Sequence, residues 1–254
     1  MTKEILDNLK IYNGTKEDLL GRKANIWLGV SISLKPYSDE LAKKYLQFIV
    51  KHTKEKALIF IGDEIAAINY KVLEKYSWET SLKKALEKGD LFVEKYERLI
   101  KTLSKEDQEK IIVVRWRDVW TDKLEKMYEL IKEEYLNNPD FKKEIEAPII
   151  TYLKNSKRTI KESRVAKMSE YILKELPFLL DGVEYGKHKF KVFKLLLYPT
   201  YGKTSLSELV TDIQQDKRFS ELKKKLKIKG DHILIDSPIL EEAPLQLLAL
   251  PVSN

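Results

Sequence analysis

The sequence predicts an α/β fold in which a central, mostly parallel sheet is flanked by helices. Short apolar segments rich in β-branched residues alternate with longer segments of helical periodicity, a pattern typical of crossover units and parallel sheets. The chain has 254 residues, of which 43% are hydrophobic, and no Gly/Ser-rich linker or internal repeat interrupts it. Because this length supplies apolar material for one sizeable core, we expect a single domain over residues 1–254.

The elements follow from periodicity and from helix-start and turn signals along the chain. Runs of apolar and β-branched residues predict strands at 24–34, 56–62, 109–116, 189–199 and 232–236. Apolar residues that recur every three or four positions predict helices at 41–52, 64–76, 81–103, 118–137, 139–153, 157–176 and 205–213. Since helices separate the strands, we expect parallel neighbours in the sheet.

Composition excludes several classes of protein. The chain has no cysteine and only three histidines, His52, His188 and His232, so it is no disulfide scaffold, thiol enzyme, zinc finger or iron–sulfur protein. Its nine glycines form neither a dinucleotide-binding motif nor a Walker A loop, and no nucleophile elbow is present. We therefore expect no cofactor and no metal, and any catalysis must use hydroxyl nucleophiles and carboxylates.

Charge and hydropathy indicate the compartment and the kind of partner. The first twenty residues alternate charged and apolar side chains, which predicts neither a signal peptide nor a transmembrane segment. A cytoplasmic protein with no membrane partner is expected. The net charge is +7, which is enough for a local phosphate-binding face if the lysines cluster.

The end of the first predicted strand carries a glycine and two serines. Gly29, Ser31 and Ser33 share one face because side chains alternate along a strand, and ligands of open parallel sheets bind beyond the carboxyl ends of the strands. Gly29 would leave room for a substrate beside the Ser31 hydroxyl. An ordinary strand end with two serines would show the same pattern.

Two further candidates lie near element ends. Tyr171 and Glu175 are four residues apart and project together from the 157–176 helix, which we expect to end at Pro177. Tyr198 closes the 189–199 strand before Pro199, which places a phenol at the ligand edge of a parallel strand. A solvated helix edge and a core tyrosine would explain these two positions equally well.

The 81–103 helix carries a row of cations. At 100° per residue, Lys84, Lys88, Lys95 and Arg98 fall within a stripe less than about 90° wide. Such a row suits the phosphates of a nucleic acid, whose contacts need no sequence code. A helix solubilised by lysine is the alternative.

Taken in order, these residues resemble the motifs of the tRNA-dependent cyclodipeptide synthases. The family's Gly-x-Ser corresponds to Gly29-Val30-Ser31, its Tyr-x-x-x-Glu-x-Pro to residues 171–177, and its later catalytic Tyr to Tyr198. Leu34 stands where one group of the family has Asn, and Tyr198-Pro199 matches the other group. Softer matches lie at 69–70, 85–89 and 115–118.

The resemblance implies a Rossmann-like fold, similar to class I aminoacyl-tRNA synthetase catalytic domains but without their ATP-binding signatures. It implies an aminoacyltransferase that joins the amino acids of two aminoacyl-tRNAs into a diketopiperazine, because the ester of the charged tRNA is already activated. The partners would be RNA and not DNA, and we expect a monomer.

The resemblance also implies roles for the candidate residues. Ser31 would form an aminoacyl-enzyme, Tyr171 and Glu175 would hold the α-ammonium group, and Tyr198 would relay a proton during cyclisation. Gly29 and Phe178 would border the bound aminoacyl group. The stripe Lys84, Lys88, Lys95 and Arg98 would grip the acceptor arm of the tRNA, with a second basic stretch at 154–161. A hydrolase of acyl esters and a non-catalytic tRNA-binding module are the alternatives.

Overall fold

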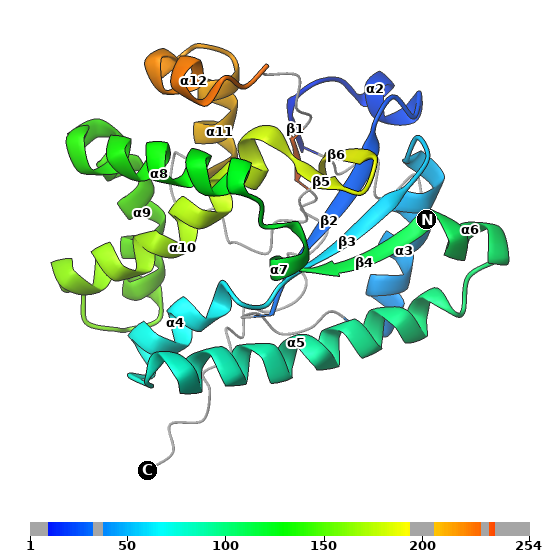
Figure 1. Ribbon diagram of the computed structural model, residues 1–254, viewed down its shortest axis with the longest axis horizontal. Coiled ribbons are helices and arrows are strands. Elements are labelled where there is room, and N and C mark those ends of the chain that lie inside the picture. Colours follow the sequence, from blue (N-terminus) through cyan, green and yellow to red (C-terminus); the bar gives the residue numbers. More distant parts are fainter. Residues whose placement is uncertain (1–9, 33–37, 194–205, 230–233, 237–254) are drawn as a thin grey trace.

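A five-stranded sheet forms the centre of the computed structural model, which describes residues 10–32, 38–193, 206–229 and 234–236 (Figure 1). Its strands lie in the order β4-β3-β2-β6-β5. Their bounds are β2 Asn25–Ser31, β3 Ala57–Gly62, β4 Ile111–Arg115, β5 Val183–Tyr185 and β6 His188–Phe193. The predicted α/β fold with a mostly parallel sheet is confirmed, because β2, β3, β4 and β6 run parallel.

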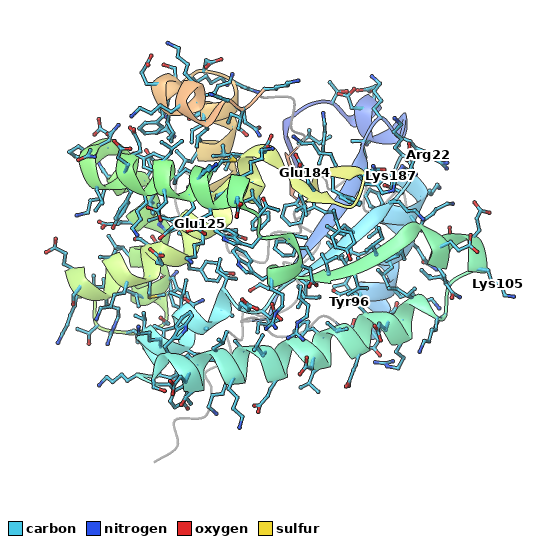
Figure 2. All side chains as sticks on the ribbon, in the orientation of Figure 1. Arg22, Tyr96, Lys105, Glu125, Glu184 and Lys187 are labelled. Atoms are coloured by element: carbon cyan, nitrogen blue, oxygen red, sulfur yellow. The ribbon has the colours of Figure 1, made fainter. Side chains whose placement is uncertain are left out.

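Helices cover both faces of this sheet. One face packs against α3 (Asp39–His52) and α5 (Trp78–Ile100). The other packs against a group made of α8 (Asp122–Asn137), α9 (Pro139–Asn155), α10 (Glu162–Asp181) and α11 (Leu206–Gln214). Figure 1 shows α8, α9 and α10 grouped together, away from α3 and α5, and Figure 2 shows Tyr96 of α5 between that helix and the sheet.

Shorter elements connect these layers. They are α2 (Lys16–Leu20), α4 (Ala66–Leu73), α6 (Lys105–Lys110), α7 (Trp116–Val119) and α12 (Ser220–Leu226). A separate two-stranded sheet pairs β1 (Lys10–Asn13) with β7 (Leu234–Asp236) in antiparallel fashion. Within the part of the chain that the structure describes, no helix is long and apolar enough to cross a membrane.

Alternation along β2 and β3 assigns their side chains to the two layers. Leu28, Val30 and Ile59 join the core beside α3 and α5. Trp27 and Phe60 join the core beside α10. Since Ser31 lies an even number of residues from Trp27, its side chain belongs to the α10 side of the sheet.

The prediction that the helix before Pro177 ends there is wrong. Helix α10 continues to Asp181 and ends at Gly182, whose φ of 82° lies in the left-handed region that glycine tolerates. Proline inside a helix costs about 3 kcal/mol. Burial of Phe178, Leu179 and Leu180, each at most 1% exposed, offsets this cost, because each contributes roughly 1.5–3 kcal/mol.

The edge of the sheet also differs from the prediction. Strand β5 pairs antiparallel with β6 through a tight turn at Gly186, whose φ is 58°. The sequence pattern does not indicate β5 because it has three residues, two of which are exposed. The predicted strand at 189–199 is observed as β6 up to Phe193, and its remaining residues lie outside the described ones.

Candidate active site

Ser31 ends the central strand of the sheet. Strand β2 has β3 on one side and β6 on the other, and Ser31 pairs in register with Gly62, the last residue of β3. The serine is half-buried. Carboxyl ends of neighbouring parallel strands form the usual ligand edge of an open α/β sheet, so the Ser31 hydroxyl has the position expected of a nucleophile that meets a substrate from outside the sheet.

The space beside Gly29 differs from the expectation, because it is filled from within the protein. A Cβ atom on Gly29 would lie 2.9 Å from Cζ3 of Trp27, two residues earlier on the same face. Trp27 is 2% exposed. Gly29 therefore accommodates the indole ring of Trp27, and this ring forms part of the surface on the Ser31 side of the sheet.

Helix α10 turns the Tyr171 and Glu175 side toward that same face of the sheet. At 100° per residue, Tyr171, Glu175 and Phe178 fall within about 60° of one another on the helix. Phe178 contacts Phe60 of β3, with ring centroids 4.9 Å apart, and Phe60 contacts Trp27 of β2 at 5.5 Å. The structure thus brings the Tyr171-Glu175 pair and Ser31 to one side of the sheet.

Burial differs among the candidates on α10. Tyr171 is 6% exposed and Phe178 is fully buried, whereas Glu175 is half-buried. Phe178 also contacts the rings of Trp116 and Trp120, with centroids 4.9 and 5.7 Å away. These rings and Phe60 form a layer between α10, α7 and the sheet. Phe178 therefore supports the position of α10, and its predicted contact with the aminoacyl group stays a prediction.

Two of the sequence candidates cannot be placed. Tyr198 and Ser33 lie outside the described residues, as does the Tyr198-Pro199 motif as a whole. Among the residues that are described, no group of three or more histidines, aspartates or glutamates could hold a metal ion.

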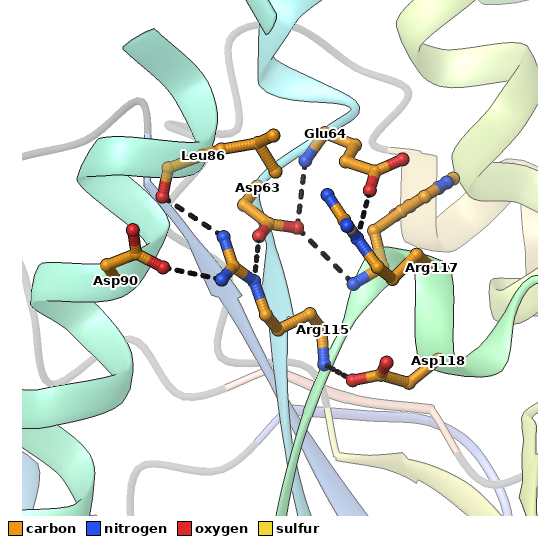
Figure 3. Close-up of polar contacts among 8 residues, drawn as sticks. Asp63, Glu64, Leu86, Asp90, Arg115, Arg117 and Asp118 are labelled. Atoms are coloured by element: carbon orange, nitrogen blue, oxygen red, sulfur yellow. Dashed lines mark hydrogen bonds and ion pairs between the residues drawn. The ribbon is translucent and has the colours of Figure 1, made fainter. Parts of the chain in front are cut away.

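A buried carboxylate that sequence reasoning did not single out lies at the carboxyl edge beside β2 (Figure 3). Asp63 directly follows β3 and is fully buried. It accepts hydrogen bonds from Nε of Arg115 at 2.5 Å, from the backbone N–H of Glu64 at 2.8 Å and from that of Trp116 at 3.3 Å. The sequence feature that could have pointed to Asp63 is its position directly after a buried strand.

Arg115 also forms hydrogen bonds to helix α5. Its Nη1 donates to Asp90 at 2.5 Å and its Nη2 donates to the backbone carbonyl of Leu86 at 3.0 Å. The helix can approach so closely because residue 89 is glycine: a Cβ there would lie 2.8 Å from Asp63 and 2.9 Å from Nη2 of Arg115. The network therefore joins the ends of β3 and β4 to the middle of α5.

The cations of the predicted stripe on α5 have different surroundings. Lys95 and Arg98 both form ion pairs with Asp39 at the start of α3, at 3.1 and 2.8 Å. Lys88 is half-buried, and burial lowers the pKa of its amine. Lys84 is exposed, and its Nζ lies 5.1 Å from the ring centroid of Tyr76. The four cations share a side of the helix but do not form one uniform exposed row.

We predict that Gly89→Ala destabilises the protein, although alanine normally strengthens a helix by up to about 1 kcal/mol relative to glycine. The added methyl group would overlap Asp63 and Arg115, and overpacking of this kind costs typically about 1–3 kcal/mol. Urea unfolding of both proteins measures the difference. Gly62→Ala is the control, because its Cβ would lie in ordinary contact, 3.5 Å or more from its neighbours. Equal or greater stability of Gly89→Ala would contradict the packing described.

Comparisons with known proteins find similarity in structure only. No family model matches the sequence, and no curated protein matches it. Among solved structures, a cyclodipeptide synthase from Bacillus thermoamylovorans is similar over 92% of this chain and 97% of its own, with a TM-score of 0.68 and 14% identity. One from Staphylococcus haemolyticus covers 90% and 97%, with a TM-score of 0.65 and 17% identity.

A third solved structure is also similar. A Mycobacterium tuberculosis protein, described as showing that cyclodipeptide synthetases are related to type I tRNA synthetases, is similar over 77% of this chain and 86% of its own. Its TM-score is 0.56 and its identity 13%. The chain therefore has the fold of the solved cyclodipeptide synthases.

Proposed function

We propose that this protein is a tRNA-dependent cyclodipeptide synthase, which makes a diketopiperazine from two aminoacyl-tRNAs through an aminoacyl-enzyme on Ser31. The observation that carries the proposal is the position of this hydroxyl at the carboxyl end of the central strand, on the side of the sheet covered by Tyr171 and Glu175. The fold and the order of the sequence motifs support it. The Tyr198-Pro199 motif assigns the chain to the group of the family without Asn after the serine motif.

The first step is an acyl transfer to Ser31. Its Oγ attacks the ester carbonyl of one aminoacyl-tRNA, the bond to the ribose oxygen breaks, and the proton of the serine passes to that leaving oxygen. Of the histidines that the structure describes, His52 ends α3 and His188 begins β6, both at the opposite edge of the sheet, and His232 lies outside the described residues. In this proposal the terminal ribose hydroxyl of the tRNA takes part in removing the proton of Ser31.

The carboxylate and phenol on α10 recognise the bound aminoacyl group. Glu175 and Tyr171 accept hydrogen bonds from the α-ammonium, and such charge-assisted bonds are shorter and stronger than neutral ones. Glu175 then accepts a proton as the amine of the aminoacyl group on Ser31 attacks the ester carbonyl of the second aminoacyl-tRNA, and the ribose oxygen of that tRNA leaves. The product of this transfer is a dipeptidyl group that remains attached to Ser31.

Cyclisation releases the product. The free amine of the dipeptide attacks its own serine ester, which forms the second amide bond of a six-membered ring and returns the proton to Ser31. The reaction is intramolecular, so it benefits from high effective concentration. We assign the proton relay of this step to Tyr198, which matches the family's later catalytic Tyr and which the sequence predicts to close the 189–199 strand. No ATP is required because both esters arrive activated.

Helix α5 supplies the RNA contact in this proposal. Lys84, Lys88, Lys95 and Arg98 would bind phosphates of the acceptor arm. The side chains of Arg98 and Asp39 are 62% and 49% exposed, and an exposed ion pair contributes only about 0–1 kcal/mol. A phosphate can therefore replace Asp39 beside Arg98 at little cost. The side chain of Lys95 is 16% exposed, so its ion pair with Asp39 is the more protected of the two.

We predict that Ser31→Ala abolishes both the acyl-enzyme and the cyclic product while the protein stays folded, because the variant removes only a half-buried hydroxyl. Intact-mass measurement after mixing with charged tRNA detects the adduct, and product analysis detects the diketopiperazine. Ser33→Ala is the matched control. Loss of the adduct in Ser33→Ala but not in Ser31→Ala would show that the nucleophile is misassigned. Release of a free amino acid by the wild-type protein would identify a hydrolase.

Glu175→Gln separates binding from proton transfer. The amide keeps the size of the side chain and one acceptor but cannot take up a proton. We therefore expect the first acyl transfer to persist in part, and attack of the bound amine on the second aminoacyl-tRNA to slow by the roughly 10²–10⁴-fold typical of acid–base catalysis. The acyl-enzyme should then accumulate in the mass spectrum.

The matched control for this variant is Glu170→Gln, also on α10. Glu170 accepts a hydrogen bond from the hydroxyl of Tyr128 on α8 and has no role in the proposed reaction. We expect it to make the cyclic product at the wild-type rate. Wild-type product formation by Glu175→Gln itself would remove this carboxylate from the mechanism.

A further inference from the structure

An exposed segment with two aromatic side chains joins α4 to α5. Residues 75–80 are all exposed, and among them Tyr76 is 38% and Trp78 46% exposed. They flank Ser77, whose side chain caps α5 by accepting a hydrogen bond from the backbone N–H of Thr80 at 3.1 Å. No aliphatic side chain interrupts this run, so the surface differs from the contiguous apolar centre of a protein interface.

Each aromatic ring has a lysine beside it. Nζ of Lys84 lies 5.1 Å from the ring centroid of Tyr76, and Nζ of Lys71 lies 5.7 Å from that of Trp78. Within the described residues neither lysine forms an ion pair, in contrast to Lys95 and Arg98 farther along α5. These amines are therefore available to an anion that arrives together with a flat aromatic group.

The surrounding charge is positive. The segment 71–84 contains four lysines and two glutamates. Of the two glutamates, Glu74 forms an ion pair with Arg158 at 3.3 Å. This arginine also donates a hydrogen bond to the backbone carbonyl of Leu73. The remaining Glu79 leaves an excess of cations around both rings, which favours a polyanionic partner.

The segment lies beyond the edge of the sheet that holds Ser31. Arg115, at the end of β4, bonds to Leu86 and Asp90 and so fixes the middle of α5 at that edge. Because α5 then leads back toward the start of β4, its earlier residues extend outward. Trp78 precedes Leu86 by two turns, which is about 12 Å along the helix axis.

We propose that Tyr76 and Trp78, with Lys71 and Lys84, form a stacking site for unpaired nucleotides of RNA. A base would stack on each ring while the neighbouring lysine moves from the ring to a phosphate of the same strand. Base stacking is stronger than an exposed cation–π contact, so the exchange favours the nucleotide. The inference rests on the proposed function, because an RNA whose acylated end is at Ser31 must leave across this edge.

The test uses two RNA hairpins that share one duplex stem, one blunt and one with an unpaired 3′ overhang, at one fixed salt concentration. Neither carries an amino acid. We expect Tyr76→Ala and Trp78→Ala each to weaken binding of the overhang hairpin by about 5- to 150-fold and to leave the blunt hairpin nearly unchanged. Trp78→Phe keeps a ring and is expected to keep most of the affinity.

Leu136→Ala is the matched control, because Leu136 is an exposed apolar residue on α8 at 69% exposure. Lys84→Ala is expected to lower the salt dependence of binding, whereas the aromatic variants leave it unchanged. Equal losses for both hairpins, no loss, or the same loss in Leu136→Ala would overturn the stacking site. So would a loss that tracks self-association of the protein, which would identify a protein interface.

The two proposals fail separately. Binding of the uncharged hairpins does not require Ser31, so wild-type protein that binds both hairpins equally would refute the stacking site alone. Wild-type protein that forms no adduct with charged tRNA, yet prefers the overhang, would refute the proposed function alone.

Discussion

The ion pair between the buried Asp63 and the half-buried Arg115 holds the carboxyl edge of the sheet against helix α5, and the candidate site depends on this contact. It joins the ends of β3 and β4 beside Ser31. Hydrogen bonds from Arg115 to Leu86 and Asp90 then fix the position of α5 along this edge. Removal of Arg115 would leave the buried carboxylate of Asp63 without its cation, and in fully buried pairs such a loss costs about 3–5 kcal/mol. Gly89 is part of the same arrangement, since any side chain there would separate the helix from the carboxylate.

On the other face of the sheet, a layer of aromatic rings holds helix α10 in position. Trp27, Phe60 and Phe178 connect β2, β3 and α10 through ring contacts of 5.5 and 4.9 Å, and this contact determines which side of α10 meets the sheet. Because Tyr171 and Glu175 lie on that side, the proposed recognition pair and the Ser31 hydroxyl lie on the same side of the sheet. The absence of a Cβ at Gly29 lets the Trp27 ring enter the layer.

Local sequence patterns predicted much of the fold, because apolar β-branched runs and helical periodicity are local properties. The spacing of Tyr171 and Glu175 likewise predicted that they project together. Contacts between distant segments were not predictable: Asp63 and Arg115 are 52 residues apart, and nothing local indicates that Gly89 faces them. The predicted helix end at Pro177 was wrong for a related reason. Burial of the three residues after it outweighs the tendency of proline to end a helix. The place of Tyr198 remains a prediction from the motif.

The most direct test is a crystal structure of the protein after reaction with an aminoacyl chloromethyl ketone, which places an electrophilic carbon where the ester carbonyl of a charged tRNA would lie. We predict a covalent bond to Oγ of Ser31, with the α-ammonium of the adduct within about 2.7–3.2 Å of both Tyr171 and Glu175. An adduct on another residue, or one on Ser31 whose ammonium points away from α10, would contradict the assignment of a single site shared by the central strand and this helix.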